Sequence, residues 1–234
     1  MSTETTTPDA VVFDFDGVIV NTEPLHFEAF RRVLLPLGLA FTWEEYTSYY
    51  LGFDDRDAFR EAFKKGGRSL DDGYLQQLMR DKAKAFRALV EERGVEAYPG
   101  VIPLIWSLSG KVPIALCSGA LEGDIEPILC KLDIDGIFDV VVTADEVETS
   151  KPSPISYLLV VERLMASFPN QGISAGHCVA IEDTPAGIDA AKAAGLAVLA
   201  VSNSYGAEKL TAAQQVVKSL EGVTALDLAA LAQA

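Results

Sequence analysis

Two aspartates stand at the end of an apolar run near the start of the chain, and a glycine follows them. The run Val11–Phe13 predicts a buried strand, which Asp14, Asp16 and Gly17 follow. Two ionised carboxylates at one strand end repel each other and lose solvation, so they need a cation between them or one keeps its proton. Mg²⁺ is the simplest such cation, because it prefers carboxylate oxygens and usually also binds waters and a substrate phosphate. The alternative is that both aspartates only cap the turn after the strand.

Later apolar runs of the chain also end in groups that can bind phosphate or metal. These groups are Ser118 and Gly119 after residues 112–117, Lys151 in the loop after residues 140–143, and Glu182 and Asp183 after residues 178–181. Taken alone each is a weak signal, since Ser-Gly is an ordinary turn pair and Lys151 fits a solvated loop lysine. Ligands of open parallel sheets bind outside the carboxyl ends of the strands. Together these groups predict one rim with the composition of a magnesium-dependent phosphoryl-transfer site.

The elements that must position this rim follow from the alternation of apolar patterns. Short apolar runs, including residues 197–201, alternate with helical patterns near residues 122–132, 154–168 and 185–194, which predicts a parallel sheet with helices on both faces. Residues 23–94 instead carry apolar side chains at helical spacing, with Asp54 and either Asp71 or Asp72 as helix starts. The alanine-rich C-terminus, from about Val223, predicts a final helix.

The sequence therefore predicts an α/β fold with a Rossmann-like parallel-sheet core and an inserted all-helical cap domain. Residues 1–22 and 95–234 would form the core, and residues 23–94 would form the cap. A cap of this kind is expected to close on the core and to supply selectivity.

Composition limits the partners. The chain has 19 Lys and Arg against 34 Asp and Glu, a net charge of −15, which argues against nucleic acid or an anionic membrane. An anionic substrate must therefore be drawn by a local positive group. Cys117, Cys130 and Cys178 lack metal-ligand spacing, and neither a signal peptide nor an apolar stretch of about 18 residues is evident. We expect a soluble cytoplasmic protein, a monomer or weak dimer, whose partner is a small phosphorylated metabolite.

Four segments resemble, in order and wording, the motifs of the haloacid dehalogenase superfamily. D-F-D-G-V-I-V-N-T-E resembles its first motif, S-G its second, S-K-P-S-P its third and I-E-D-T-P-A-G-I its fourth. The helical insert after the first motif resembles the C1 cap of the β-phosphoglucomutase-like subgroup, which also includes phosphoglycolate phosphatases and sugar-phosphate phosphatases. The resemblance spans nearly the whole chain.

The resemblance implies catalytic roles at the rim. Asp14 would be the nucleophile that forms an aspartyl-phosphate. Asp16 would be the general acid toward the leaving group and then the base for water. Ser118 with Gly119, and Lys151, would bind the oxygens of the transferring phosphoryl group.

The resemblance also implies the metal ligands. Mg²⁺ would be held by Asp14, by the backbone carbonyl of Asp16 and by Asp183. Glu182 would assist, through a water molecule. The expected cofactor is therefore Mg²⁺.

The cap shows both matches to the subgroup and departures from it. His26, Gly52 and Arg56 are the candidate substrate-binding residues of the cap, although His26 fits a partly buried helix histidine equally well. The mutase branch has a phosphate-gripping arginine where this chain has Asp55, one residue before Arg56. In the third motif, Ile155 replaces an aspartate that usually begins a helix.

Three functions are compatible with this pattern. The favoured one is a Mg²⁺-dependent phosphatase acting on a small phosphorylated metabolite, with a sugar phosphate as the expected substrate. The second is a β-phosphoglucomutase-like mutase, which would return the phosphoryl group to the sugar. The third is a catalytically silent regulator that binds a phosphometabolite, and the intact set of Asp14, Asp16, Lys151 and Asp183 argues against it.

Overall fold

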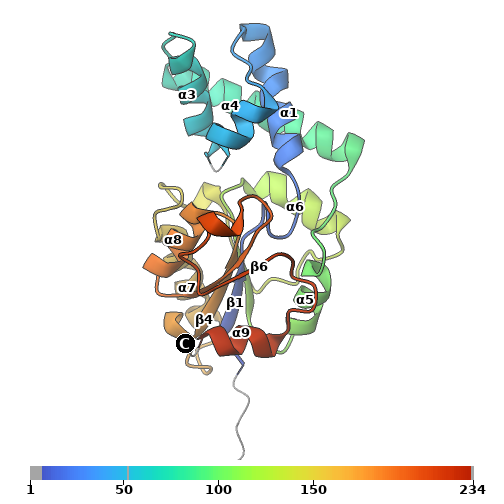
Figure 1. Cartoon of the computed structure of the whole chain (residues 1–234), viewed down its shortest axis with the longest axis vertical. Coiled ribbons are helices and arrows are strands. Elements are labelled where there is room, and N and C mark those ends of the chain that lie inside the picture. The colour runs from blue at the N-terminus through green and yellow to red at the C-terminus, as the bar shows by residue number, and fades with distance from the viewer. Residues whose placement is uncertain (1–6, 52, 233–234) are drawn as a thin grey trace, which may run out of the picture. The chain divides into compact units, whose positions relative to one another are not determined.

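The chain divides into two compact units. The structure is a computed structural model that describes residues 7–51 and 53–232. The α/β unit comprises residues Met1–Asn21 and Glu96–Ala234, and the helical unit comprises residues Thr22–Val95 (Figure 1). None of the helices in the described part of the chain is both long and apolar enough to cross a membrane.

A parallel sheet forms the centre of the α/β unit. Its strands lie in the order β3-β2-β1-β4-β5-β6, and every neighbouring pair is parallel. Their bounds are β1 Ala10–Phe13, β2 Ile114–Cys117, β3 Val140–Val142, β4 Cys178–Glu182, β5 Ala197–Val201 and β6 Gln215–Val217. All residues of β1 are buried and apolar, as expected for a central strand covered on both faces. The structure confirms the predicted α/β class with a Rossmann-like parallel sheet.

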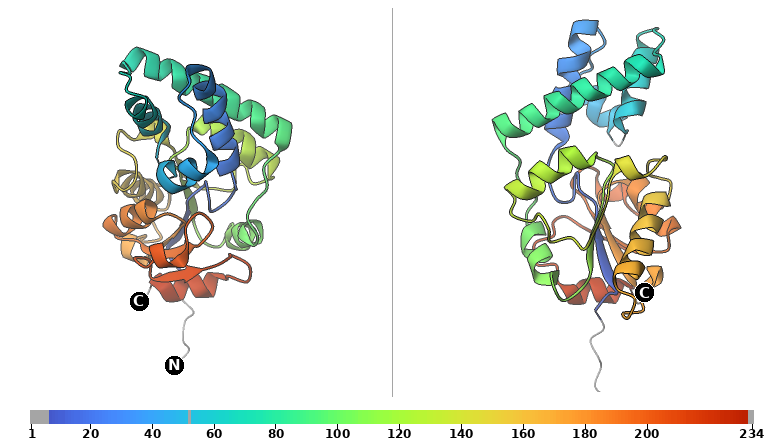
Figure 2. Two further views of the ribbon diagram at one scale, coloured as in Figure 1. Left: turned by 45° about the horizontal axis from the view of Figure 1, so that its top comes forward. Right: turned by 180° about the vertical axis from the view of Figure 1, so that it is seen from behind.

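Helices cover both faces of this sheet (Figure 2). They are α5 Val101–Leu108, α6 Glu122–Lys131, α7 Ile155–Ser167, α8 Pro185–Ala193 and α9 Ala225–Ala232. Helices α7 and α8 pack on the face that carries Val12, Ala115 and Ala180. Helices α5 and α9 contact each other, and α9 also contacts β4 and β5. The alternation of strand and helical patterns therefore translates directly into layers, because each βα unit returns the chain to the same sheet.

Three details of this unit differ from the sequence-based prediction. Strand β2 begins at Ile114 rather than Val112, because Pro113 between them has no N–H to donate to a neighbouring strand. Helix α5 was not predicted, since V-I-P-L-I-W-S-L is almost uniformly apolar and shows no helical period. Strand β6 was not predicted either, because it is only three residues long at the sheet edge and Gln215 is exposed.

The helical unit contains α1 Glu23–Leu34, α2 Trp43–Glu45, α3 Asp55–Lys65 and α4 Asp72–Arg93, with a π-helical turn at Tyr46–Tyr50. No strand occurs among its described residues, as predicted. Its core is built largely from aromatic and leucine side chains, among them Phe30, Leu34, Phe41, Phe59, Phe63, Leu75 and Leu78. These side chains recur at helical spacing on the inner faces of their helices, so the aromatic residues form a packed core.

Side-chain caps fix the starts of the two longer helices after α1. An Asp54 oxygen accepts a hydrogen bond from the Asp57 N–H at 2.7 Å, and an Asp71 oxygen accepts one from the Tyr74 N–H at 2.9 Å. Both predicted helix starts are therefore confirmed, with Asp71 rather than Asp72 as the cap of α4. Such a cap is worth about 1 kcal/mol.

Candidate active site

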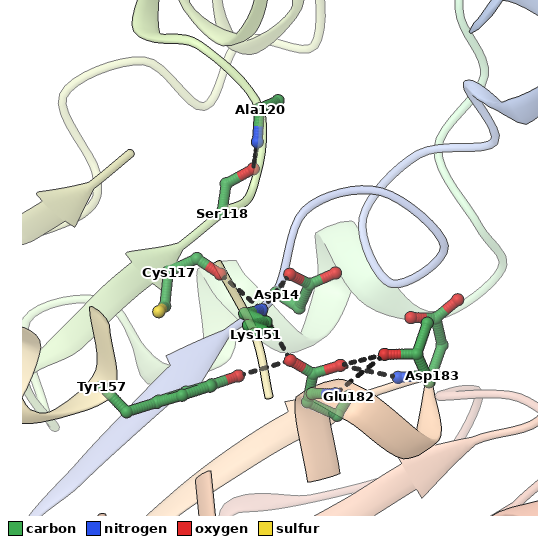
Figure 3. Close-up of polar contacts among 10 residues, drawn as sticks. Asp14, Cys117, Ser118, Ala120, Lys151, Tyr157, Glu182 and Asp183 are labelled. Atoms are coloured by element: carbon green, nitrogen blue, oxygen red, sulfur yellow. Dashed lines mark hydrogen bonds and ion pairs between the residues drawn. The ribbon is translucent and has the colours of Figure 1, made fainter. Parts of the chain in front are cut away.

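Side chains from three strand ends meet at one edge of the sheet (Figure 3). Asp14 follows β1, Ser118 follows β2, and Glu182 ends β4 with Asp183 next. The Asp14 N–H donates to the Ile181 oxygen at 3.0 Å, so the pairing of β1 with β4 continues one residue past β1. Because all the strands are parallel, their carboxyl ends lie at the same edge.

Lys151 is held between two of these carboxylates (Figure 3). Its Nζ donates to Asp14 Oδ1 at 2.6 Å, to Glu182 Oε1 at 2.6 Å and to the backbone oxygen of Cys117 at 3.0 Å. The ammonium has three protons, so these bonds use all of them. Only 14% of the side chain is exposed, so the interpretation of Lys151 as a solvated loop lysine is wrong. Burial lowers the pKa of Lys151, but the Asp14 and Glu182 carboxylates outweigh it and raise the pKa well above its ordinary value, so the ammonium stays charged.

Glu182 is fixed by donors on both oxygens. Oε1 accepts from Lys151 and from the Tyr157 hydroxyl at 2.6 Å, and Oε2 accepts from the Asp183 N–H at 3.2 Å. The first turn of α8 lies close by, since a Cβ added at Gly187 would fall 2.0 Å from Glu182 Oε2. Glu182 therefore has one well-defined orientation, in which it holds Lys151 in place.

Tyr157 was not identified from the sequence. It is a fully buried residue of α7, in the same cluster as Val160 and Val161, and its hydroxyl donates to Glu182 at the rim. Burial and the Glu182 carboxylate raise the pKa of Tyr157 well above its ordinary value, so its hydroxyl remains a donor. The sequence placed Tyr157 on the apolar stripe of the helix after S-K-P-S-P, which indicates burial. That position does not reveal which residue its hydroxyl contacts.

Three buried carboxylates form a cluster that could hold a divalent cation. Asp14, Glu182 and Asp183 each offer one carboxylate oxygen, and these oxygens all lie within 4.8 Å of one another. Oxygen ligands lie about 2.0–2.1 Å from Mg²⁺, so two ligands on opposite sides of the ion are about 4 Å apart. The separation and the chemistry of the donors therefore fit this ion.

The electrostatics of Asp14 also favour a cation beside these carboxylates. Burial raises the pKa of Asp14 from 3.8 to about 8; the Lys151 ammonium opposes this shift, and the Glu182 and Asp16 carboxylates add to it. One ammonium thus faces several carboxylates at this edge. A divalent cation beside Asp14 would lower its pKa and favour the ionised form that a nucleophile requires.

The loop that carries Asp16 turns tightly after β1. The Gly17 N–H donates to the Val20 oxygen at 2.9 Å, and the Ile19 N–H donates to the Phe15 oxygen at 2.8 Å. Gly17 has φ +85°, and a Cβ there would lie only 1.8 Å from Asp183 Oδ2. Glycine is therefore required for its positive φ and for the close approach to Asp183. Asp16 itself is half-buried, beside the Asp14 carboxylate whose pKa it raises.

Ser118 and Gly119 occupy the end of β2. The Ser118 N–H donates to the Val142 oxygen at 2.9 Å, and its Oγ accepts from the Ala120 N–H at 3.0 Å. Ser118 is buried, whereas Gly119 is exposed and no atom lies within 4 Å of a Cβ added there. The chain thus turns at this strand end, and the serine hydroxyl oxygen points toward the Ala120 N–H (Figure 3).

The substrate-binding residues expected within the segment 23–94 belong to the helical unit. His26 on α1 is half-buried and its ring stacks on Phe86 with centroids 4.2 Å apart, while Arg56 on α3 is exposed. Gly52 lies outside the described residues. Lys82 of α4, which sequence reasoning missed, is 1% exposed; its Nζ lies 2.7 Å from His26 Nδ1 and donates to Asp55 Oδ1 at 2.7 Å. The sequence feature that could have identified Lys82 is its position on the apolar stripe of its helix, where a lysine needs a polar partner.

The ion pair of Lys82 and Asp55 predicts a stability difference between two neighbouring aspartates. Asp55→Ala leaves a buried ammonium without its carboxylate and is expected to lower the free energy of unfolding by about 3 kcal/mol in urea titrations. Asp57→Ala is the matched control, because Asp57 is exposed in the same first turn of α3. The double variant Asp55→Ala with Lys82→Met should regain much of the loss, since an apolar replacement of a whole buried pair is nearly neutral. Equal losses for the two aspartates would contradict this account.

Several known proteins resemble this chain over most of its length. Residues 11–201 match the family model described as haloacid dehalogenase-like hydrolase. A phosphorylated carbohydrates phosphatase of Thermotoga maritima is 32% identical over 192 residues, which cover 80% of this chain and 82% of that protein. The fructose-1-phosphate phosphatase YqaB of Escherichia coli is 32% identical over 186 residues, which cover 80% of this chain and 92% of that protein. The β-phosphoglucomutase structure from Clostridium difficile is similar at a TM-score of 0.79 with 25% identity, covering 93% of each chain.

Proposed function

The chain belongs to the haloacid dehalogenase-like hydrolases, and from this premise we propose that it is a Mg²⁺-dependent phosphatase of a small sugar phosphate that acts through an aspartyl-phosphate on Asp14. The observation that carries the proposal is Lys151, held at 2.6 Å from Asp14 beside a cluster of three buried carboxylates. Its family and its phosphatase relatives support the hydrolysis of phosphoric monoesters. Two of these relatives are named for phosphorylated carbohydrates and for fructose 1-phosphate, which favours a sugar phosphate as the substrate.

Asp14 would attack phosphorus in the first step. A bond forms between its carboxylate oxygen and phosphorus while the bond from phosphorus to the sugar oxygen breaks. Asp16 gives its proton to the departing sugar oxygen. The Ser118 hydroxyl would donate to a phosphoryl oxygen, and the Lys151 ammonium beside Asp14 would attract the phosphoryl oxygens through its charge. Glu182 keeps Lys151 in position.

Water would release the phosphoryl group in the second step. Asp16, now ionised, takes a proton from the water molecule, whose oxygen bonds to phosphorus. The bond from phosphorus to Asp14 breaks, which returns the carboxylate and frees inorganic phosphate. Asp14, Asp183 and the Asp16 carbonyl would hold Mg²⁺. When bound, this ion would act as a Lewis acid that offsets the negative charge of the phosphoryl oxygens.

The helical unit would act as the cap that selects the substrate. Its first helix, α1, begins at Glu23, only a few residues after the Asp14–Val20 loop in the chain. His26 and Arg56 are the proposed contacts to the non-reacting part of the sugar. The unit is compact by itself, which is what a lid that moves as one body requires.

A mutase is not favoured. Such an enzyme must bind an intermediate with two phosphates, and an arginine is the side chain best suited to grip the second one. This chain has Asp55 at the corresponding spacing, and its carboxylate is engaged with Lys82. Asp54 and Asp57 add negative charge to the same segment, which repels a second phosphate.

The test is a phosphate-release assay on a panel of phosphorylated metabolites with and without Mg²⁺. We expect Mg²⁺-dependent release of inorganic phosphate, with sugar phosphates as the best substrates. One arm supplies β-glucose 1-phosphate with a trace of the bisphosphate and follows glucose 6-phosphate against free phosphate. Isomer that forms faster than phosphate would assign the protein to the mutases, and binding of sugar phosphates without turnover would make it a regulator.

A further inference from the structure

The loop after β1 is tied to a side chain that the proposed mechanism does not use. Asn203 lies two residues past the end of β5, and its Nδ2 donates to the Gly17 backbone oxygen at 2.7 Å. Strand β5 does not neighbour β1, because β4 lies between them. The Asn203 side chain therefore reaches across the end of β4, where Asp183 lies, to hold Gly17, which is 186 residues earlier in the sequence.

This contact completes the restraint of Gly17. The Gly17 N–H is bonded to the Val20 oxygen at 2.9 Å, and the Gly17 oxygen is bonded to Asn203. In a planar trans peptide the N–H and the preceding carbonyl point in opposite directions, so the bond from the Gly17 N–H also fixes the direction of the Asp16 carbonyl. Glycine is the residue with the greatest backbone freedom, so these bonds restrain the point at which the loop could most easily rotate.

The surroundings of Gly17 leave it little space on the side of the carboxylate cluster. A Cβ at this position would lie 1.8 Å from Asp183 Oδ2 and 2.8 Å from Ser204 Oγ. The residue after Asp16 is thus packed against Asp183 and Ser204 and bonded to Asn203. A substitution of Asn203 should therefore displace Asp16 more than Asp14, because Asp14 is held by Lys151 and by the strand pairing.

We infer that Asn203 is a positioning residue for Asp16: through Gly17 it holds the Asp16 carboxylate where it can protonate the leaving group. The inference rests on the proposed function, in which Asp16 is the general acid. Asn203 itself touches neither the phosphoryl group nor the leaving group. Its contribution is geometric, because general acid catalysis requires the donor within hydrogen-bond reach of the departing oxygen.

The dependence of the rate on the leaving group separates this role from a merely structural one. Benzyl phosphate releases an alkoxide that needs a proton, whereas 4-nitrophenyl phosphate, of similar size, releases a stable phenolate that does not. The value of kcat/KM reports the steps up to loss of the leaving group. Asn203→Ala should lower kcat/KM for benzyl phosphate about tenfold or more, which is part of the ~10²–10⁴-fold that a general acid supplies. The loss for 4-nitrophenyl phosphate should stay below about threefold, because that ester uses little of this contribution.

Three further variants complete the experiment. Asp16→Asn is the reference for the loss of the general acid and should show the same selectivity with a larger loss. Asn203→Asp keeps the side-chain shape but removes the amide donor, so it should reproduce the selective loss even if Asn203→Ala does not fold. Asn170→Ala is the matched control, because Asn170 is exposed in the loop after α7.

The outcomes distinguish the inference from the proposed function. A selective loss in Asn203→Ala or Asn203→Asp, parallel to that of Asp16→Asn, supports the positioning role. Equal losses for both esters in the Asn203 variants, with a selective loss in Asp16→Asn, overturn the inference and leave the phosphatase mechanism standing. An absence of selectivity in Asp16→Asn itself overturns the acid role of Asp16, and the inference about Asn203 with it.

Discussion

Asp14→Asn is expected to lower phosphate release by ~10⁴-fold or more, the scale of loss seen when a nucleophile is removed from an enzyme. The amide of asparagine cannot form the aspartyl-phosphate, so the covalent route is closed. The measurement is initial-rate phosphate release with the best sugar phosphate of the panel, at a protein concentration high enough to detect a ~10⁴-fold lower rate.

The variant should remain folded. Asparagine keeps an oxygen that can accept the Lys151 hydrogen bond, and it removes a carboxylate whose pKa burial raises to about 8. We therefore expect a thermal midpoint at or above that of the wild type. Asp135→Asn is the control for the same change of charge, since Asp135 is an exposed residue of the same unit. Activity within about tenfold of the wild type, or about 1.4 kcal/mol of barrier, would remove Asp14 from the role of nucleophile.

A covalent readout supports the rate measurement. Rapid quenching of the wild-type enzyme during turnover, followed by peptide mass analysis, should place a phosphoryl group on the peptide that contains Asp14. The Asp14→Asn protein should show no such modification. A phosphoryl group on a different peptide would point to another nucleophile.

Removal of divalent metal is expected to lower the rate by about a thousandfold or more, equivalent to about 4 kcal/mol of barrier. The reason is the cluster of Asp14, Glu182 and Asp183, whose oxygens lie within 4.8 Å and whose negative charge a single ammonium does not balance. Dialysis against a chelator should abolish phosphate release, and added Mg²⁺ should restore it.

A binding measurement without substrate tests the same site independently of activity. Mg²⁺ should raise the thermal midpoint of the wild-type protein, because a ligand that binds only the folded state stabilises it. Asp183→Asn should lose most of this shift and most of the activity. Asp189→Asn, on the exposed face of α8, should keep both. A magnesium-induced shift that is unchanged in Asp183→Asn would place the ion elsewhere.

The sequence by itself determined the sheet, its helical layers and the chemistry of the rim. Apolar runs that alternate with helical patterns can satisfy their burial only as a parallel sheet covered on both faces. Once the strands are parallel, Asp14, Ser118 and Asp183 must stand at one edge, because each directly follows a strand. Local pattern therefore sufficed for these residues. It did not suffice for β6 or α5, where a short edge strand and a uniformly apolar helix carry no period.

Only the tertiary structure decided which polar side chains at and near the rim are buried and what they hold. Lys151 could have been a solvated loop lysine, but it is tied to Asp14, 137 residues away in the sequence. The sequence did not reveal the roles of Tyr157 and Asn203, since these roles depend on contacts with Glu182 and Gly17. Local periodicity records which face of an element is buried, whereas hydrogen-bond partners far apart in the chain are chosen only when the packed elements bring them together.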